Sequence, residues 1–141
     1  LPERHVIQRS ATCEASPKQV WRVITDHKTE PQWRSNLTDT ERQSTAAGQI
    51  IWVETYDTGD SVALQTTASE PPRRLVRTIR DEDGPFAGRW EFQLERVDNG
   101  CRVVLTERGR VSNPIFRFIS TYLLGHATFV EQYLDDLRDR L

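Results

Sequence analysis

The sequence predicts an α+β fold in which a seven-stranded antiparallel sheet wraps around a long C-terminal helix. Three observations predict it: strand-like residues at the beginning of the chain, turn signals that divide residues 37–111 into six short segments, and a long amphipathic segment after residue 113. The 141 residues are expected to form one domain, residues 1–141. Two separate cores would each be too small to be stable without metals or disulfides.

Residues 5–14 have the composition of a strand, and a short helix is expected directly after them. Ser16 is suited to cap this helix, and Gln19 lies three residues later, as a capping box requires. The next stretch, residues 26–36, is polar apart from one large aromatic, Trp33. This pattern predicts a second short helix packed under the sheet.

The middle of the chain changes to a period of about two residues, which is typical of strands. Three of its segments have the usual length of a strand: Ile50–Tyr56, Val62–Ala68 and Leu75–Ile79. The alternation is clearest where Trp90, Phe92 and Leu94 are separated by charged or polar residues. That strand is therefore expected to have one dry face and one wet face.

The last periodic segment, from Pro114 to Leu141, predicts a helix of nearly thirty residues. Its apolar residues recur at spacings of three and four and form one stripe: Phe116, Ile119, Leu123, Ala127, Val130, Leu134, Leu137 and Leu141. No other predicted element is long enough to cover the dry face of a six-stranded sheet.

Several short motifs, in this order along the chain, carry a resemblance to a known family: Ala15-Ser16-Pro17 with Val20-Trp21, Pro31 to Trp33, Glu70 to Leu75, Trp90 with Leu94, Leu105-Thr106-Glu107, and Asn113 to Phe116 with Tyr133-Leu134. The chain resembles the START-like superfamily, also called SRPBCC or helix-grip proteins, and within it the polyketide cyclase/dehydrase-like group. The resemblance covers the whole chain. It implies a helix-grip fold with a ligand cavity between the sheet and the C-terminal helix, and it carries over no catalytic residue.

The net charge of -2 argues against nucleic-acid binding, and the arginines at positions 73, 74, 77 and 80 lie beside acidic residues that are expected to neutralise them. No run of about 20 apolar residues is present, so no stable membrane insertion is expected, and the charged first eight residues favour a cytoplasmic protein. The expected partner is a small hydrophobic molecule, and the expected state is a monomer or homodimer.

Five aromatic residues are candidate ligand contacts. Trp33 lies in the short helix that is close to the cavity entrance in the resembling fold. Trp52 and Tyr56 share one face of a strand, and the sequence does not decide which face is inside. Trp90 is explained at least as well by core packing, and Phe118 flanks the apolar stripe of the final helix.

Three polar residues are also candidates. Arg77 shares the parity of Leu75 and Ile79, so on an interior face its guanidinium is suited to anchor a ligand carboxylate or phenolate. Tyr122 and His126 are four residues apart on the final helix and are suited to orient a carbonyl or exchange a proton. The alternative for His126 is a hydrogen bond to backbone or solvent.

No metal site, cofactor site or nucleophile is expected, because the histidines and cysteines lack zinc-ligand spacing and no phosphate-binding loop or nucleophile elbow occurs. His5 and His27 are interpreted as surface residues. Cys13 and Cys101 are expected to be neighbours, as reduced buried thiols, if the first strand pairs with the last as in the resembling fold.

Three functions therefore remain open. The first is binding of a lipid, polyketide or aromatic metabolite in the cavity. The second is a polyketide cyclase or aromatase-like enzyme, and the third is a regulatory domain that binds another protein.

Overall fold

The computed structural model describes residues 3–80, 86–111 and 127–141. Its elements are, in chain order, β1 (Glu3–Cys13), α1 (Pro17–Thr25), the 3-10 turn η1 (His27–Thr29), α2 (Glu30–Trp33), β2 (Leu37–Ser44), β3 (Ile50–Tyr56), β4 (Ser61–Glu70), β5 (Arg74–Ile79), β6 (Phe86–Val97), β7 (Gly100–Val111) and α4 (Ala127–Arg140).

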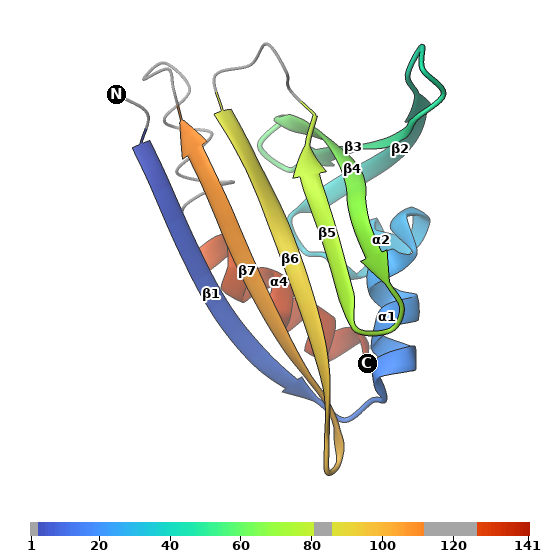
Figure 1. Ribbon diagram of the computed structural model, residues 1–141, viewed down its shortest axis with the longest axis vertical. Coiled ribbons are helices and arrows are strands. Elements are labelled where there is room, and N and C mark those ends of the chain that lie inside the picture. Colours follow the sequence, from blue (N-terminus) through green and yellow to red (C-terminus); the bar gives the residue numbers. More distant parts are fainter. Residues whose placement is uncertain (1–2, 81–85, 112–126) are drawn as a thin grey trace.

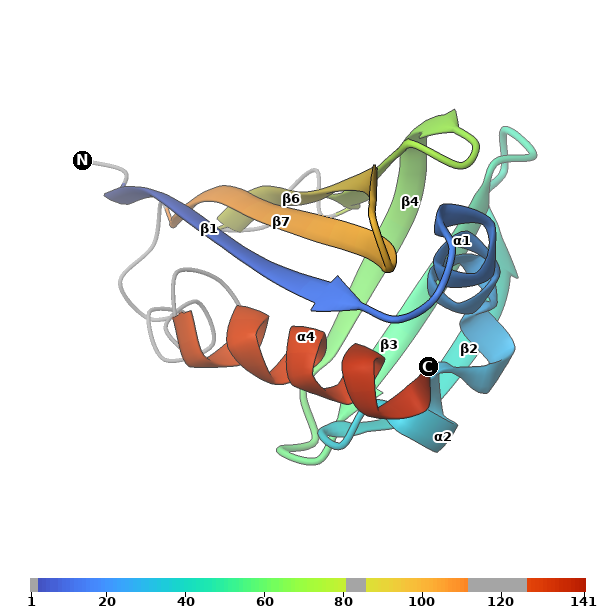
Figure 2. The ribbon, with the colours of Figure 1, turned by 90° about the horizontal axis from the view of Figure 1, so that it is seen from below.

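The seven strands form one antiparallel sheet in the order β1-β7-β6-β5-β4-β3-β2. The sheet bends so that β1, β7 and β6 pass over α4 while β3 and β2 curl down towards α2 (Figures 1 and 2). We call the face that is turned towards α4 the inner face. The predicted fold is confirmed, including the pairing of the first strand with the last, which places Cys13 opposite Cys101 as two free buried thiols.

The connection from β1 to β2, which are the two edge strands of the sheet, contains the predicted capping box. The Ser16 hydroxyl accepts a hydrogen bond from the backbone N–H of Gln19 at 3.2 Å, and the Gln19 side chain accepts one from the backbone N–H of Ser16 at 2.8 Å. Two otherwise unpaired N–H groups of α1 are thereby satisfied. Val20 and Ile24 of α1 are fully buried in the core.

The C-terminal helix contributes the other half of the core. Val130, Leu134 and Leu137 of α4 are buried together with inward residues of β6 and β7, such as Phe92 and Leu105. The predicted stripe is therefore confirmed for Val130, Leu134 and Leu137, whereas Leu141 follows the end of the helix and is 38% exposed. The part of the stripe before residue 127 lies outside the described residues. Within the described residues, no helix combines the length and the apolar character that crossing a bilayer requires.

A polar contact also holds α4 against the connection between α2 and β2. Asp136 accepts hydrogen bonds through Oδ2 from the backbone N–H of Ser35 at 2.8 Å and from the Ser35 hydroxyl at 2.9 Å. Because Asp136 lies in the second half of α4, these bonds connect that end of the helix to the chain next to α2 (Figure 2).

The structure decides the orientation of β3, which the sequence left open. Glu54 and Tyr56 are buried, and Trp52 lies on the same side of the strand. The inner face of β3 is therefore the one that carries an acid and two aromatic rings.

Candidate functional site

Four charged side chains meet in the interior where α1 and α2 approach β3 and β5. We call them the ion cluster: Glu30, Arg34, Glu54 and Arg77. None of them exposes more than 3% of its surface. Burying a charge costs several kcal/mol unless it is paired, so two acids and two bases are a balanced set that a folded interior can tolerate.

Arg34 is at the centre of this cluster. Its Nη1 donates to Glu30 Oε2 and to Glu54 Oε2, at 2.8 Å in both cases. Arg77 lies 3.1 Å from Glu30 Oε1 through Nη1, and its Nη2 donates to the backbone carbonyl of Ile24. The cluster thus joins α1, α2, β3 and β5.

The pKa values of Glu30 and Arg34 are both shifted in the direction that favours the charged form. Burial alone would raise the pKa of Glu30, but the positive charges of Arg77 and Arg34 and the contact with His27 outweigh burial and hold that pKa well below its ordinary value. Burial also opposes the charge of Arg34, but Glu54, Tyr56, Glu30 and Tyr133 together outweigh burial, so the pKa of Arg34 is raised.

Aromatic rings surround the ion cluster. The Tyr56 hydroxyl donates to Glu54 Oε1 at 2.5 Å and accepts from Arg34 Nη2 at 3.4 Å. The Arg34 guanidinium lies 5.0 Å from the centre of the Tyr133 ring, and Trp33 packs edge-on against that ring at 5.3 Å. Burial raises the pKa of Tyr56 and that of Tyr133, so both phenols stay protonated.

A second polar group on the inner face is formed by Glu107, His5 and Trp90. Glu107, on β7, is fully buried. It accepts a hydrogen bond from Trp90 Nε1 at 2.8 Å and lies 2.9 Å from His5 Nε2. Across residues 3–80, 86–111 and 127–141, no three His, Cys, Asp or Glu side chains gather in a way that could hold a metal ion.

Trp90, whose indole N–H binds Glu107, also contacts the aromatic rings beside the ion cluster. It packs edge-on against Tyr133 at 5.3 Å and against Phe129 at 5.5 Å. Trp90 also belongs to a set of apolar inner-face side chains that are only half-buried, which we call the half-buried row: Ile7, Leu64, Ile79 and Trp90.

The structure brings four of the predicted site residues together. Trp33 and Trp90 contact the Tyr133 ring, and Tyr56 and Arg77 contact Arg34 and Glu30 of the ion cluster. Arg77 is indeed interior, but the carboxylate that it holds is the chain's own Glu30. Trp33 is buried in the core.

The remaining predicted residues are placed differently. Trp52 stacks on His27 with ring centres 4.6 Å apart and planes 19° from parallel, beside the ion cluster. Phe118, Tyr122 and His126 lie outside the described residues.

The interpretation of His5 and His27 as surface residues is wrong. Their side chains are only 19% and 13% exposed, and each lies next to a fully buried carboxylate, Glu107 for His5 and Glu30 at 3.3 Å for His27. The physical reason is that a buried carboxylate is stabilised by a polar neighbour, and here a histidine is that neighbour. The sequence did not show that Glu30 and Glu107 are buried, so it gave no reason to place a histidine beside them.

Four buried acids were not recognised in the sequence: Glu30, Glu54, Glu107 and Asp136. Two of them had a signal in the alternation: Glu54 shares the parity of Tyr56, and Glu107 shares that of Leu105. Glu30 had none, because a four-residue helix gives too little periodicity to define a buried face.

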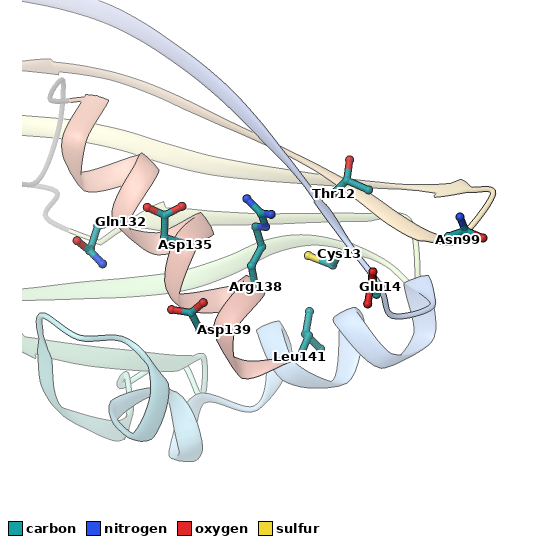
Figure 3. A pocket seen from close by; sticks show the side chains of 9 residues that line it. All are labelled: Thr12, Cys13, Glu14, Asn99, Gln132, Asp135, Arg138, Asp139 and Leu141. Atoms are coloured by element: carbon teal, nitrogen blue, oxygen red, sulfur yellow. The ribbon is translucent and has the colours of Figure 1, made fainter.

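A separate groove of about 730 Å³ opens between the end of β1, the turn from β6 to β7 and the last turns of α4 (Figure 3). Its lining is mostly polar: Thr12, Cys13, Glu14, Asn99, Gln132, Asp135, Arg138, Asp139 and Leu141. Burial raises the pKa of the Cys13 thiol, and the nearby Arg138 only partly offsets this effect. The groove is thus a charged surface feature and differs in character from the aromatic inner face.

Comparison with known proteins identifies the family and the fold. A family model described as "Polyketide cyclase / dehydrase and lipid transport" matches residues 4–141. No curated protein sequence matches the chain.

Among solved structures, norcoclaurine synthase from Thalictrum flavum in complex with dopamine and hydroxybenzaldehyde is similar with a TM-score of 0.72 and 12% identity, covering 99% of this chain and 87% of that one. An uncharacterised Bacillus thuringiensis protein has a TM-score of 0.70 and 14% identity, with 96% and 98% covered. A START superfamily protein from Mycobacterium smegmatis has a TM-score of 0.67 and 12% identity, with 96% of each chain covered. At these identities the likeness shows the fold alone, and it agrees with the helix-grip architecture.

Proposed function

This chain belongs to the polyketide cyclase/dehydrase and lipid transport family, and on that premise we propose that it binds a small hydrophobic molecule between the inner face of the sheet and the C-terminal helix. The START-like resemblance noted in the sequence is confirmed by this membership. The ligand classes that fit the proposal are a lipid, a polyketide or another aromatic metabolite.

The observation that carries the proposal is the half-buried row. Ile7, Leu64, Ile79 and Trp90 point towards the interior, yet each keeps part of its surface accessible. Apolar surface gains roughly 25 cal/mol for each Å² removed from water, so a hydrophobic guest that covers this row is stabilised by it. The neighbouring Trp90 and Phe129 rings supply an aromatic wall.

The test compares two neighbouring positions that point to opposite faces of β4. Leu64→Trp fills the space over the inner face, whereas Gln65→Trp adds the same ring to the outer face. Binding of 2-ethylnaphthalene and of dodecanoic acid is measured by displacement of 1-anilinonaphthalene-8-sulfonate and by thermal shift. A ligand at 100 times its dissociation constant adds about 2.7 kcal/mol to stability.

We expect the wild type and Gln65→Trp to bind at least one ligand, and Leu64→Trp to bind it at least about tenfold more weakly, because the added ring occupies the guest's place. Urea unfolding establishes that both variants are folded. Equal binding by the two variants, or no binding by the wild type, contradicts the proposal.

A second candidate, an enzyme of the cyclase or dehydratase kind, is favoured by one observation. His5 and Glu107 form a hydrogen-bonded pair on the inner face beside Trp90, and such a pair is suited to remove and return a proton. The test is mass spectrometry of a bound polyketide-like ligand after incubation. If the wild type removes one water molecule from the ligand and the His5→Gln variant does not, the enzyme is supported. If the ligand is recovered unchanged, binding alone is supported.

A further inference from the structure

Within residues 3–80, 86–111 and 127–141, six buried side-chain atoms make no hydrogen bond. Two of them, His27 Nδ1 and Glu30 Oε1, lie 3.3 Å from each other, and the other four are hydrogen-bond donors. They are the Nε1–H of Trp33, the Nε–H of Arg34, the Nε–H of Arg77 and the hydroxyl of Tyr133. All four side chains are at most 8% exposed. A buried donor without an acceptor destabilises the folded state, so a set of four needs an explanation.

The four donors belong to residues that gather around one ring. Trp33 meets the Tyr133 ring edge-on at 5.3 Å, and the Arg34 guanidinium lies 5.0 Å from the centre of that ring. Arg77 joins the same group through Glu30, which it shares with Arg34. The four side chains are therefore neighbours, and we call their donor groups together the donor shell.

The charge balance indicates which acceptor the donor shell suits. The two positive charges of Arg34 and Arg77 are already matched by Glu30 and Glu54, so a ligand carboxylate would add a third negative charge to a buried, neutral cluster. An ammonium group has only N–H donors and no acceptor, so it cannot satisfy these donors. A neutral carbonyl oxygen accepts up to two hydrogen bonds and brings no charge.

The surroundings of the donor shell indicate the rest of the ligand. The Trp90 ring packs against Tyr133 at 5.3 Å with the two planes at 89°, and Phe129 packs against Trp90 at 5.5 Å. Leu64, Ile79 and Trp90 of the half-buried row pack against the apolar cluster that contains Phe129. An apolar or aromatic body is thus expected to extend from the carbonyl along Trp90.

We propose that the donor shell binds the neutral carbonyl group of the ligand, a ketone or ester on an apolar or aromatic body, with Tyr133 and Trp33 as its hydrogen-bond donors. This inference rests on the proposed function, since it assigns the polar end of the same ligand.

The experiment uses three ligands with one aromatic body: 2-acetylnaphthalene, 2-ethylnaphthalene and 2-naphthoate. Affinities are measured with the wild-type protein at pH 7.5 by displacement of 1-anilinonaphthalene-8-sulfonate. The ketone is expected to bind about 3- to 10-fold more tightly than the hydrocarbon, the ratio that one net hydrogen bond supplies. The carboxylate is expected to bind more weakly than the ketone because its charge is not compensated.

Tyr133→Phe removes one donor and keeps the ring. It is expected to remove most of the preference for 2-acetylnaphthalene while 2-ethylnaphthalene binds within about twofold of the wild type, since the apolar contacts remain. Proton–nitrogen spectra of the wild type give a second readout that needs no variant. The indole N–H signal of Trp33, assigned with Trp33→Phe, should move downfield with the ketone and not with the hydrocarbon.

The two proposals fail in different ways. If the ketone and the hydrocarbon bind equally, if the carboxylate binds most tightly, or if the Trp33 signal does not respond to the ketone, the carbonyl assignment is wrong while hydrophobic binding stands. If none of the three naphthalenes binds, both proposals are overturned.

Discussion

Replacing Arg34 by methionine tests whether the ion cluster holds the interior together. Arg34 makes two charge-assisted hydrogen bonds at 2.8 Å, to Glu30 and Glu54, and each such bond contributes about 1.5–3 kcal/mol. The variant leaves two buried carboxylates with only Arg77 as a cation, and breaking a buried pair in this way costs about 3–5 kcal/mol. We expect Arg34→Met to lower the free energy of unfolding by about 4 kcal/mol in urea denaturation at pH 7.

The matched control is Arg73→Met. The Arg73 guanidinium lies 3.8 Å from Glu70 and is 76% exposed, so its removal should leave stability unchanged within error. The double variant Arg34→Met/Glu54→Gln restores the charge balance and should recover part of the loss. If Arg34→Met is no more destabilising than Arg73→Met, the cluster does not contribute to stability as we have argued.

Three further predictions concern other parts of the molecule. The lowered pKa of Glu30 means that its ionised form stabilises the fold at neutral pH. The free energy of unfolding in urea should therefore decrease as the pH falls below the ordinary glutamate pKa. This decrease should be smaller in Glu30→Gln, which has no carboxylate to protonate at that position. Ser35→Ala removes one of the two hydrogen bonds to Asp136 and should cost about 1 kcal/mol by thermal denaturation; an unchanged melting temperature would count against this contact. Burial raises the pKa of Cys101 to about 11 and that of Cys13 also, so both thiols should react with iodoacetamide at pH 8 at least about tenfold more slowly than in urea, and equal rates by mass spectrometry would refute their burial.

Much of the architecture could be predicted because its signals are local. The capping box of Ser16 and Gln19 involves residues three apart, and the dry face of Trp90, Phe92 and Leu94 follows from a period of two. The number of strands and the position of the final helix followed from such signals, and family resemblance supplied the arrangement. The position of Cys13 opposite Cys101 was also predicted from the family resemblance.

The interior chemistry was foreseen only in part. Arg77 was identified because its parity matches that of Leu75, whereas Arg34 lies in the polar connection after α2, where no alternation marks an inner face. The side of β3 that faces inward was undecided, so Glu54 was not recognised as buried.

The sequence by itself therefore determined the elements, their order and the apolar surfaces that bring them together, since these depend on residues within a few positions of one another. Only the tertiary structure decided the charge partners. Arg34 and Glu54 are 20 residues apart and His5 and Glu107 are 102 apart, and each pair meets because the bend and strand register of the sheet bring distant elements to one interior. The free energy of a buried charge depends on its partner, and a partner that distant leaves no trace in local periodicity.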